Sequence, residues 1–247
     1  MKQTLFLSVA STIKKTDLEC HEKKLKNINI RHFLIEGNNK KTLNKEEGDY
    51  FTITFDDEQI MKEPKNQRIQ NEVTKILQRF IKKYHKGGIF LIIGIGNQEI
   101  LADSFGVNVT NEIIATNHYN DFLTIPKVAI FNPEMTEKTG ISSYNLIQTV
   151  VNDLKPDMLI IVDSLATNHK EYLNNTIEIN DTGIIPGEAM RNNKEISKKT
   201  FGIPVISIGG TFIYQNDNEL YTKVSLKEDI KNISQIVSKS INHTFFS

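Results

Sequence analysis

Four short apolar runs recur along the chain, and stretches with helical periodicity separate them. The runs occupy residues 89–93, 128–131, 158–162 and 205–208. Each run is too short for a helix, and a strand that is apolar at nearly every position is typical of a parallel sheet covered on both faces. These four segments therefore predict buried parallel strands.

The segments between the runs favour helices. Apolar side chains recur along residues 69–81 at helical spacing, which predicts an amphipathic helix that stops before Gly87 and Gly88. An aromatic and β-branched segment at 50–55 adds a strand. Further helices are expected at 103–116, 141–154 and 226–241.

Strands that alternate with crossover helices predict an α/β fold with a mostly parallel central sheet flanked by helices on both faces. The chain of 247 residues is expected to form a single domain over residues 1–247. Its N-terminal part, about residues 1–60, has shorter apolar pieces and is expected to be less regular.

Charge and composition narrow the class of protein. Lys and Arg together number 30, as do Asp and Glu, so no net charge attracts nucleic acid or an anionic membrane. The single cysteine, Cys20, forms no internal disulfide, and the apolar run near the N-terminus is too short for a secretory leader. The six histidines lack metal-ligand spacing. We expect a cytoplasmic protein without a metal or other cofactor.

Polar residues that follow the predicted strands are the first candidates for chemistry, because functional loops leave the carboxyl ends of parallel strands. Gly96 and Asn97 follow the run 89–93, where the glycines favour a tight turn over a nucleotide site. Asp103 precedes a predicted helix, so it is either a site residue or an N-cap. Asp163 directly follows the run 158–162 and is a better candidate.

Two further candidates have structural alternatives. Asp181, Thr182 and Gly183 spell the triad of pepsin-like proteases, but those proteins are all-β and carry an apolar strand before the aspartate, whereas Asn180 precedes it here. The same three residues are good turn residues. His118 ends the helix predicted to begin at Asp103, where a cationic imidazole is favoured without any functional role.

Six segments in one order resemble the germination proteases of spore-forming bacteria. They are Gly94-Ile95-Gly96-Asn97 with Asp103, MTEKTGI at 135–141, Lys155-Pro156-Asp157, Asp163-Ser164-Leu165-Ala166, NTIEINDTGIIPG at 175–187, and GIPVISIG at 202–209. Residues 15–18 also look like the segment around that family's propeptide junction. The resemblance covers most of the chain.

This resemblance implies an endopeptidase that cuts small acid-soluble spore proteins in the spore core. It also implies a self-processed zymogen and a homo-oligomer, with a tetramer as one option. The family's two essential aspartates fall on Asp103 and Asp181. We expect supporting roles for Gly96, Asn97, His118, Asp163 and Gly183. The fold is similar to that of hydrogenase maturation proteases, whose acidic residues bind a metal, so a metal role for Asp103 or Asp163 stays open.

The chain departs from the family's pattern in three places, residues 101–107, 188–194 and 210–212. These changes put the substrate in question more than the reaction. We hypothesise that Asp103 and Asp181 lie close together and share acid and base roles in peptide hydrolysis. The alternatives are a binding protein that kept the fold without catalysis, and a metal-dependent processing peptidase.

Overall fold

A computed structural model describes residues 4–10, 19–37, 45–55, 62, 65–85, 87–119, 124–185, 195–216 and 219–247. The strands are β1 (Cys20–Leu25), β2 (Ile28–Ile35), β3 (Gly48–Phe55), β4 (Ile89–Gly94), β5 (Lys127–Phe131), β6 (Met158–Thr167), β7 (Thr176–Asn180), β8 (Val205–Gln215) and β9 (Leu220–Tyr221). The α-helices are α1 (Phe6–Ala10), α3 (Gln67–Tyr84), α4 (Phe105–Thr110), α5 (Thr136–Thr139), α6 (Ser143–Leu154), α7 (Lys198–Phe201) and α8 (Leu226–Phe246), and the 3-10 helices are η2 (Leu101–Asp103) and η3 (Lys170–Tyr172).

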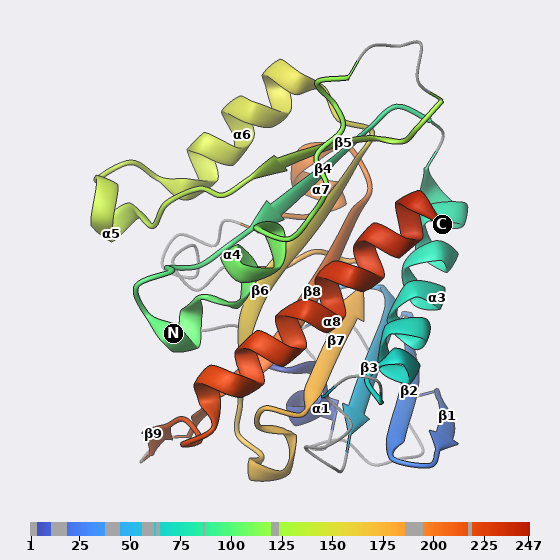
Figure 1. Cartoon of the computed structure of the whole chain (residues 1–247), viewed down its shortest axis with the longest axis vertical. Coiled ribbons are helices and arrows are strands. Elements are labelled where there is room, and N and C mark those ends of the chain that lie inside the picture. Colours follow the sequence, from blue (N-terminus) through green and yellow to red (C-terminus); the bar gives the residue numbers. More distant parts are fainter. Residues whose placement is uncertain are drawn as a thin grey trace.

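The described strands form one mixed sheet in the order β1-β2-β3-β7-β8-β6-β4-β5, with β9 on β8 (Figure 1). The four predicted runs are β4, β5, β6 and β8, and they pair with one another in parallel. The remaining pairings are antiparallel, because β1 to β3 form a meander and β7 runs against both β3 and β8. The predicted α/β fold is confirmed, but the sheet is mixed and not mostly parallel, because its parallel part is limited to β4, β5, β6 and β8.

Helices cover both faces of this sheet, as predicted. Along β4, Phe90 and Ile92 join the core formed with α3, α4 and α8, while Leu91 and Ile93 join the core formed with α6 and α7. Alternate residues of a strand point to opposite faces, so an uninterrupted apolar run is what a doubly covered strand requires. In Figure 1, α8 crosses in front of the strands.

The predicted helix at 103–116 is wrong in its bounds. Residues 101–103 form η2, and α4 ends at Thr110. The Thr110 hydroxyl lies within hydrogen-bonding distance of the carbonyl oxygens of Gly106 and Val107 and of Asn132 Oδ1, and the chain turns at this point. A β-branched residue whose hydroxyl competes for backbone acceptors favours a helix end.

The N-terminal segment packs against the sheet. Leu5, Phe6 and Leu7 are buried against β2, β3 and β6, and the Leu5 amide donates to Ala166. No helix among the residues that the structure describes is long and apolar enough to cross a membrane.

Candidate functional site

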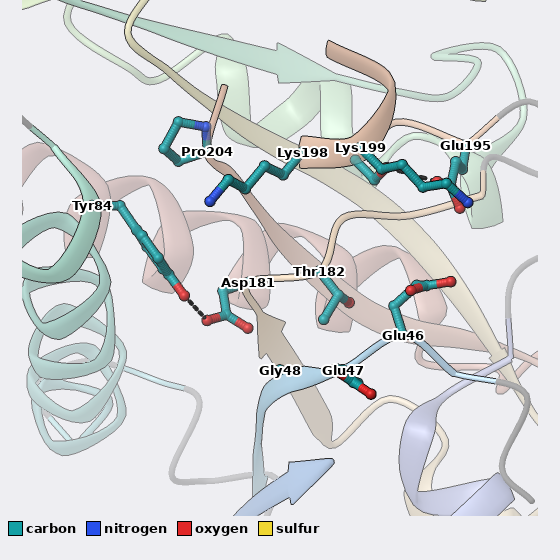
Figure 2. A pocket seen from close by; sticks show the side chains of 11 residues that line it. Glu46, Glu47, Gly48, Tyr84, Asp181, Thr182, Glu195, Lys198, Lys199 and Pro204 are labelled. Carbon is teal, nitrogen blue, oxygen red and sulfur yellow. Dashed lines mark hydrogen bonds between the residues drawn. The ribbon is translucent and has the colours of Figure 1, made fainter. Parts of the chain in front are cut away.

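Asp181 lies at the first position after β7, where the chain leaves the sheet. Its side chain is 2% exposed. Oδ1 accepts the backbone amide of Asp49 at 2.8 Å, and Oδ2 accepts the hydroxyl of Tyr84 at 2.5 Å and the ammonium group of Lys83 at 3.2 Å. Figure 2 shows the Tyr84 hydroxyl directed at this carboxylate. The carboxylate is therefore fixed by donors from two separate elements, α3 and β3.

A second buried carboxylate, that of Asp49, lies beside Asp181. Lys83 bridges the two, with its ammonium group 2.8 Å from Asp49 Oδ2 and 3.2 Å from Asp181 Oδ2. The pKa of Asp49 lies well below its ordinary value. The hydrogen bond with His32 has the largest effect, burial acts in the opposite direction, and Lys83 lowers the pKa further. Burial alone would lower the pKa of Lys83, but its bonds to Asp49 and the charge of Asp181 raise it.

Two glycines permit the chain to pass close to Asp181. A Cβ atom at Gly48 would lie 2.4 Å from Oδ1 of Asp181. Gly183 has φ +90°, and a Cβ atom there would lie 2.0 Å from the carbonyl oxygen of Ile196. The turn of Asp181-Thr182-Gly183 therefore needs glycine both for its conformation and for its contact with the segment before α7.

Asp181 faces a pocket of about 480 Å³, here called the Asp181 pocket. Its lining residues are Glu46, Glu47, Gly48, Tyr84, Asp181, Thr182, Glu195, Ser197, Lys198, Lys199 and Pro204. Acidic and basic side chains both surround the opening (Figure 2). Burial, and then the bond to Asp181, raise the pKa of the Tyr84 hydroxyl, so it stays protonated and can donate.

Asp103 is buried at the end of η2, and its carboxylate holds a loop closed. Its Oδ2 accepts the amide of Asn97 at 3.1 Å, and its carbonyl oxygen accepts the same amide at 3.2 Å. A Cβ atom at Gly96 would lie 1.9 Å from that carbonyl oxygen, which explains the glycine. Ser104, not Asp103, is the N-cap residue of α4. The N-cap alternative for Asp103 is therefore wrong.

Asp163 lies in β6 at the same end of the sheet as Asp103. It is 1% exposed, and its Oδ1 accepts the amide of Ser164 at 2.7 Å. The segment η2 contacts β6 and β8. The structure thus brings together Gly96, Asn97 and Asp103, with Asp163 on the neighbouring strand. His118 belongs to neither group, since it is exposed and its ring lies against the ring of Tyr119 in a tilted arrangement.

The strand register separates Asp103 from Asp181. Asn180 pairs with Ser207 near the start of β8, so Asp181 lies towards the amino ends of the parallel strands. Asp103 contacts Gly96, beyond the carboxyl end of β4. The two aspartates are therefore on the order of 10 Å apart along the strands, and β8 and β6 lie between β7 and β4. The structure does not bring them together as a pair. The carboxylate beside Asp181 is that of Asp49.

Asp49, Lys83 and Tyr84 were not identified from the sequence. Asp49 is the second residue of β3, directly before the aromatic segment 50–55, and is 132 positions from Asp181. Lys83 and Tyr84 end an amphipathic helix, where a cation is common for the helix dipole alone. No local spacing joins these residues, so only the packing of α3 beside β3 and β7 could reveal them. Among the described residues, no group of three or more His, Cys, Asp or Glu side chains could hold a metal ion.

Two sequence motifs lie outside the described residues. One is the altered segment 188–194, and the other is the segment 15–18.

Comparison with known proteins gives a consistent match. A family model described as germination protease matches residues 7–216. A germination protease from a Geobacillus species is 32% identical over 200 residues, which cover 76% of this chain and 53% of that protein. One from Oceanobacillus iheyensis is 33% identical over 197 residues, which cover 76% and 54%. The chain spans about half the length of the curated relatives that it matches.

Among solved structures, a NiFe hydrogenase maturation protease from Thermococcus kodakarensis is 20% identical, with a TM-score of 0.39. The match covers 67% of this chain and 98% of that one.

Proposed function

The chain belongs to the germination protease family, and from this premise we propose that it is a peptidase whose reaction takes place at Asp181. The resemblance that the six sequence segments indicated is thereby confirmed. The observation that carries the proposal is the geometry of Asp181. Its carboxylate accepts a hydrogen bond of 2.5 Å from a phenolic hydroxyl at a pocket of about 480 Å³.

The hydrolysis of a peptide bond needs a base for the attacking water and an acid for the leaving nitrogen. In the proposed mechanism Asp181 takes a proton from water, and the water oxygen forms a bond to the peptide carbonyl carbon. The Tyr84 hydroxyl or the Lys198 ammonium group stabilises the negative oxygen that results. Asp181 then returns its proton to the leaving nitrogen as the carbon–nitrogen bond breaks. Water is consumed, and the carboxylate is regenerated.

Asp103 takes a separate role in this proposal. It lies at the other end of the sheet, so within one chain it cannot share a proton with Asp181. Its carboxylate closes the loop that begins at Asn97. A contribution of Asp103 to activity through this loop stays a prediction, as do the supporting roles of Asp163 and His118.

The proposed substrates are small acid-soluble spore proteins, cleaved in the spore core. This part rests on the family, because germination proteases are the relatives that match. An extended chain that carries both acidic and basic side chains matches the charges of a pocket that offers both Glu and Lys side chains. Self-processing and assembly into a homo-oligomer stay predictions.

Cleavage of a spore-protein-like peptide, followed by mass spectrometry, tests the proposal. We expect Asp181→Asn to lower kcat at least about a hundredfold, in the range found when a catalytic acid or base is lost. Asp229→Asn is the matched control, since Asp229 is also buried and accepts hydrogen bonds from Asn174 and Ser225 at the start of α8. Full activity of Asp181→Asn would refute the proposal.

Two further arms separate the alternatives. A chelator should leave cleavage unchanged, and a loss that added metal restores would favour the metal-dependent peptidase. Binding of the peptide without any cleavage would favour the non-catalytic binding protein. Asp103→Asn, measured in parallel, tests the predicted contribution of the loop.

A further inference from the structure

Lys83 contacts three side chains of the Asp181 site from outside the pocket. Its ammonium group lies 2.8 Å from Asp49, 3.2 Å from Asp181 and 4.8 Å from the centre of the Tyr84 ring. It is the penultimate residue of α3, where the negative end of the helix dipole favours a cation. Its side chain is 45% exposed, so it reaches the buried carboxylates from the surface.

The two carboxylates need such a cation. Asp49 and Asp181 are almost completely buried, and the amide of Asp49 donates directly to Asp181. Two carboxylates this close repel each other when both are ionised, and a nearby cation removes most of that repulsion. Arg79 lies 3.5 Å from Asp49. Among the cations of the described residues, however, Lys83 is the one with an ion pair to both carboxylates.

We propose that Lys83 is the positioning residue of the Asp181 site: its ammonium group bridges the two carboxylates and holds Asp181 and Tyr84 in their mutual hydrogen bond. This inference rests on the proposed function. Lys83 does not line the Asp181 pocket, so it acts through Asp181 and not on the substrate.

Other charged and titratable groups also face this carboxylate pair, and they set the background for any pH dependence. From α3 these are Arg79 and Tyr84, from β2 and β3 His32 and Tyr50, and from the pocket Glu46, Glu47, Glu195, Lys198 and Lys199. The acids outnumber Lys198 and Lys199, so these groups do not replace the bridging cation.

Lys83→Met and Lys83→Arg, with Lys82→Met as the matched control, test the inference on the full chain. Lys82 is the exposed neighbour on the same helix. We expect Lys83→Met to move the acidic limb of the kcat/KM profile to higher pH by about one unit, as the loss of one cation near a carboxylate does. The kcat of Lys83→Met should fall, because Asp181 and Tyr84 lose the cation that holds them together, whereas KM should change little. Lys83→Arg, which keeps the charge, should restore most of kcat, and Lys82→Met should match the parent.

A second measurement does not depend on cleavage. Without the ammonium group, the ionised pair destabilises the folded state, so Lys83→Met should unfold at lower denaturant concentration than Lys82→Met at neutral pH. This difference should shrink in acid, as the pH falls below the ordinary aspartate pKa of about 3.9 and towards the lowered pKa of Asp49. Equal stability of the two variants at neutral pH would overturn the inference.

The two proposals fail in different ways. If Asp181→Asn stays active, the proposed function is wrong. If Asp181→Asn is inactive but Lys83→Met keeps the kcat and the acidic limb of the parent, only the role of Lys83 is wrong. A loss in Lys83→Met that lies wholly in KM would also overturn that role.

Discussion

The Nε2 atom of His32 lies 2.6 Å from Oδ1 of Asp49, at the back of the carboxylate pair. The imidazole stacks on the Phe51 ring, with 4.1 Å between ring centres and 3° between ring planes. This stacking fixes the ring so that one nitrogen points at Asp49. His32 thus holds the carboxylate of Asp49 in place beside Asp181.

This contact predicts a pH-dependent stability. The pKa of Asp49 is lowered in the folded state, mainly by His32, so its contribution is present above the ordinary carboxylate range and is lost as the pH falls through the lowered value. His32→Phe keeps an aromatic ring but removes the hydrogen bond. We expect it to cost about 1–3 kcal/mol at neutral pH, and less in strong acid. Urea unfolding at both pH values checks this.

The matched control for His32→Phe is His21→Phe. His21 stacks on His32 at 6.0 Å, but its side chain is 72% exposed. It should change stability by less than about 0.5 kcal/mol, as is usual for surface substitutions. An equal loss in both variants would mean that the bond to Asp49 contributes nothing.

The separation of the predicted aspartates gives a second prediction. Asp103→Asn and Asp181→Asn should have additive effects on the free energy of unfolding, within about 0.5 kcal/mol, because distant sites do not couple. Asp49→Asn and Asp181→Asn should couple by about 0.5–3 kcal/mol, because they share Lys83. Two double-mutant cycles measure both quantities. Strong coupling in the first cycle would contradict the placement of Asp103.

The buried carboxylate of Glu178 beneath the N-terminal segment, which feels the charge of the partly buried Lys45, gives a third prediction. Burial raises the pKa of Glu178, and the charge of Lys45 lowers it in part. Because the folded-state pKa is raised, stability falls as the pH rises through that value. Lys45→Met removes the compensating charge and should cost about 3 kcal/mol at neutral pH. The loss should shrink as the pH falls through the raised pKa of Glu178, because the protonated side chain no longer needs a compensating charge.

The double variant Lys45→Met with Glu178→Gln serves as the internal test. Replacing both members of a buried charge pair is often neutral or stabilising. We expect the double variant to recover the stability of the parent, and Lys26→Met, at an exposed position, to leave it unchanged. Denaturant unfolding from mildly acidic to neutral pH measures both. If Lys45→Met lost the same stability at every pH, the loss would not come from an ionised Glu178, and the prediction would be wrong.

The turn after Asp181 gives a fourth prediction. Gly183→Ala would place a Cβ atom 2.0 Å from the Ile196 carbonyl oxygen at φ +90°, so we expect a loss of at least about 2 kcal/mol and a displaced Asp181. Gly140→Ala is the control, because Gly140 also has a positive φ, +70°, but open space around it. It should cost about 1 kcal/mol and leave activity intact. Thermal unfolding and the cleavage assay report the two effects.

The parallel part of the sheet was predictable because its signal is local. Four runs are apolar at nearly every position, which indicates burial on both faces without reference to any other segment. These runs, at 89–93, 128–131, 158–162 and 205–208, all form strands. The apolar pattern does not predict the strand β7, because the polar residues Glu178 and Asn180 interrupt it. Burial of those polar side chains depends on Phe6 and Lys45, which are remote in the sequence.

The sequence by itself determined the α/β fold, the family, and the importance of Asp103, Asp163 and Asp181 as candidates. These follow from periodicity and from ordered motifs, which are properties of neighbouring residues. Only the tertiary structure decided which carboxylates meet. Strand register and direction place Asp181 at one end of the sheet and Asp103 towards the other, and the packing of α3 brings Lys83 and Tyr84 to Asp181 beside Asp49. Such contacts depend on how distant segments pack, so no local pattern encodes them.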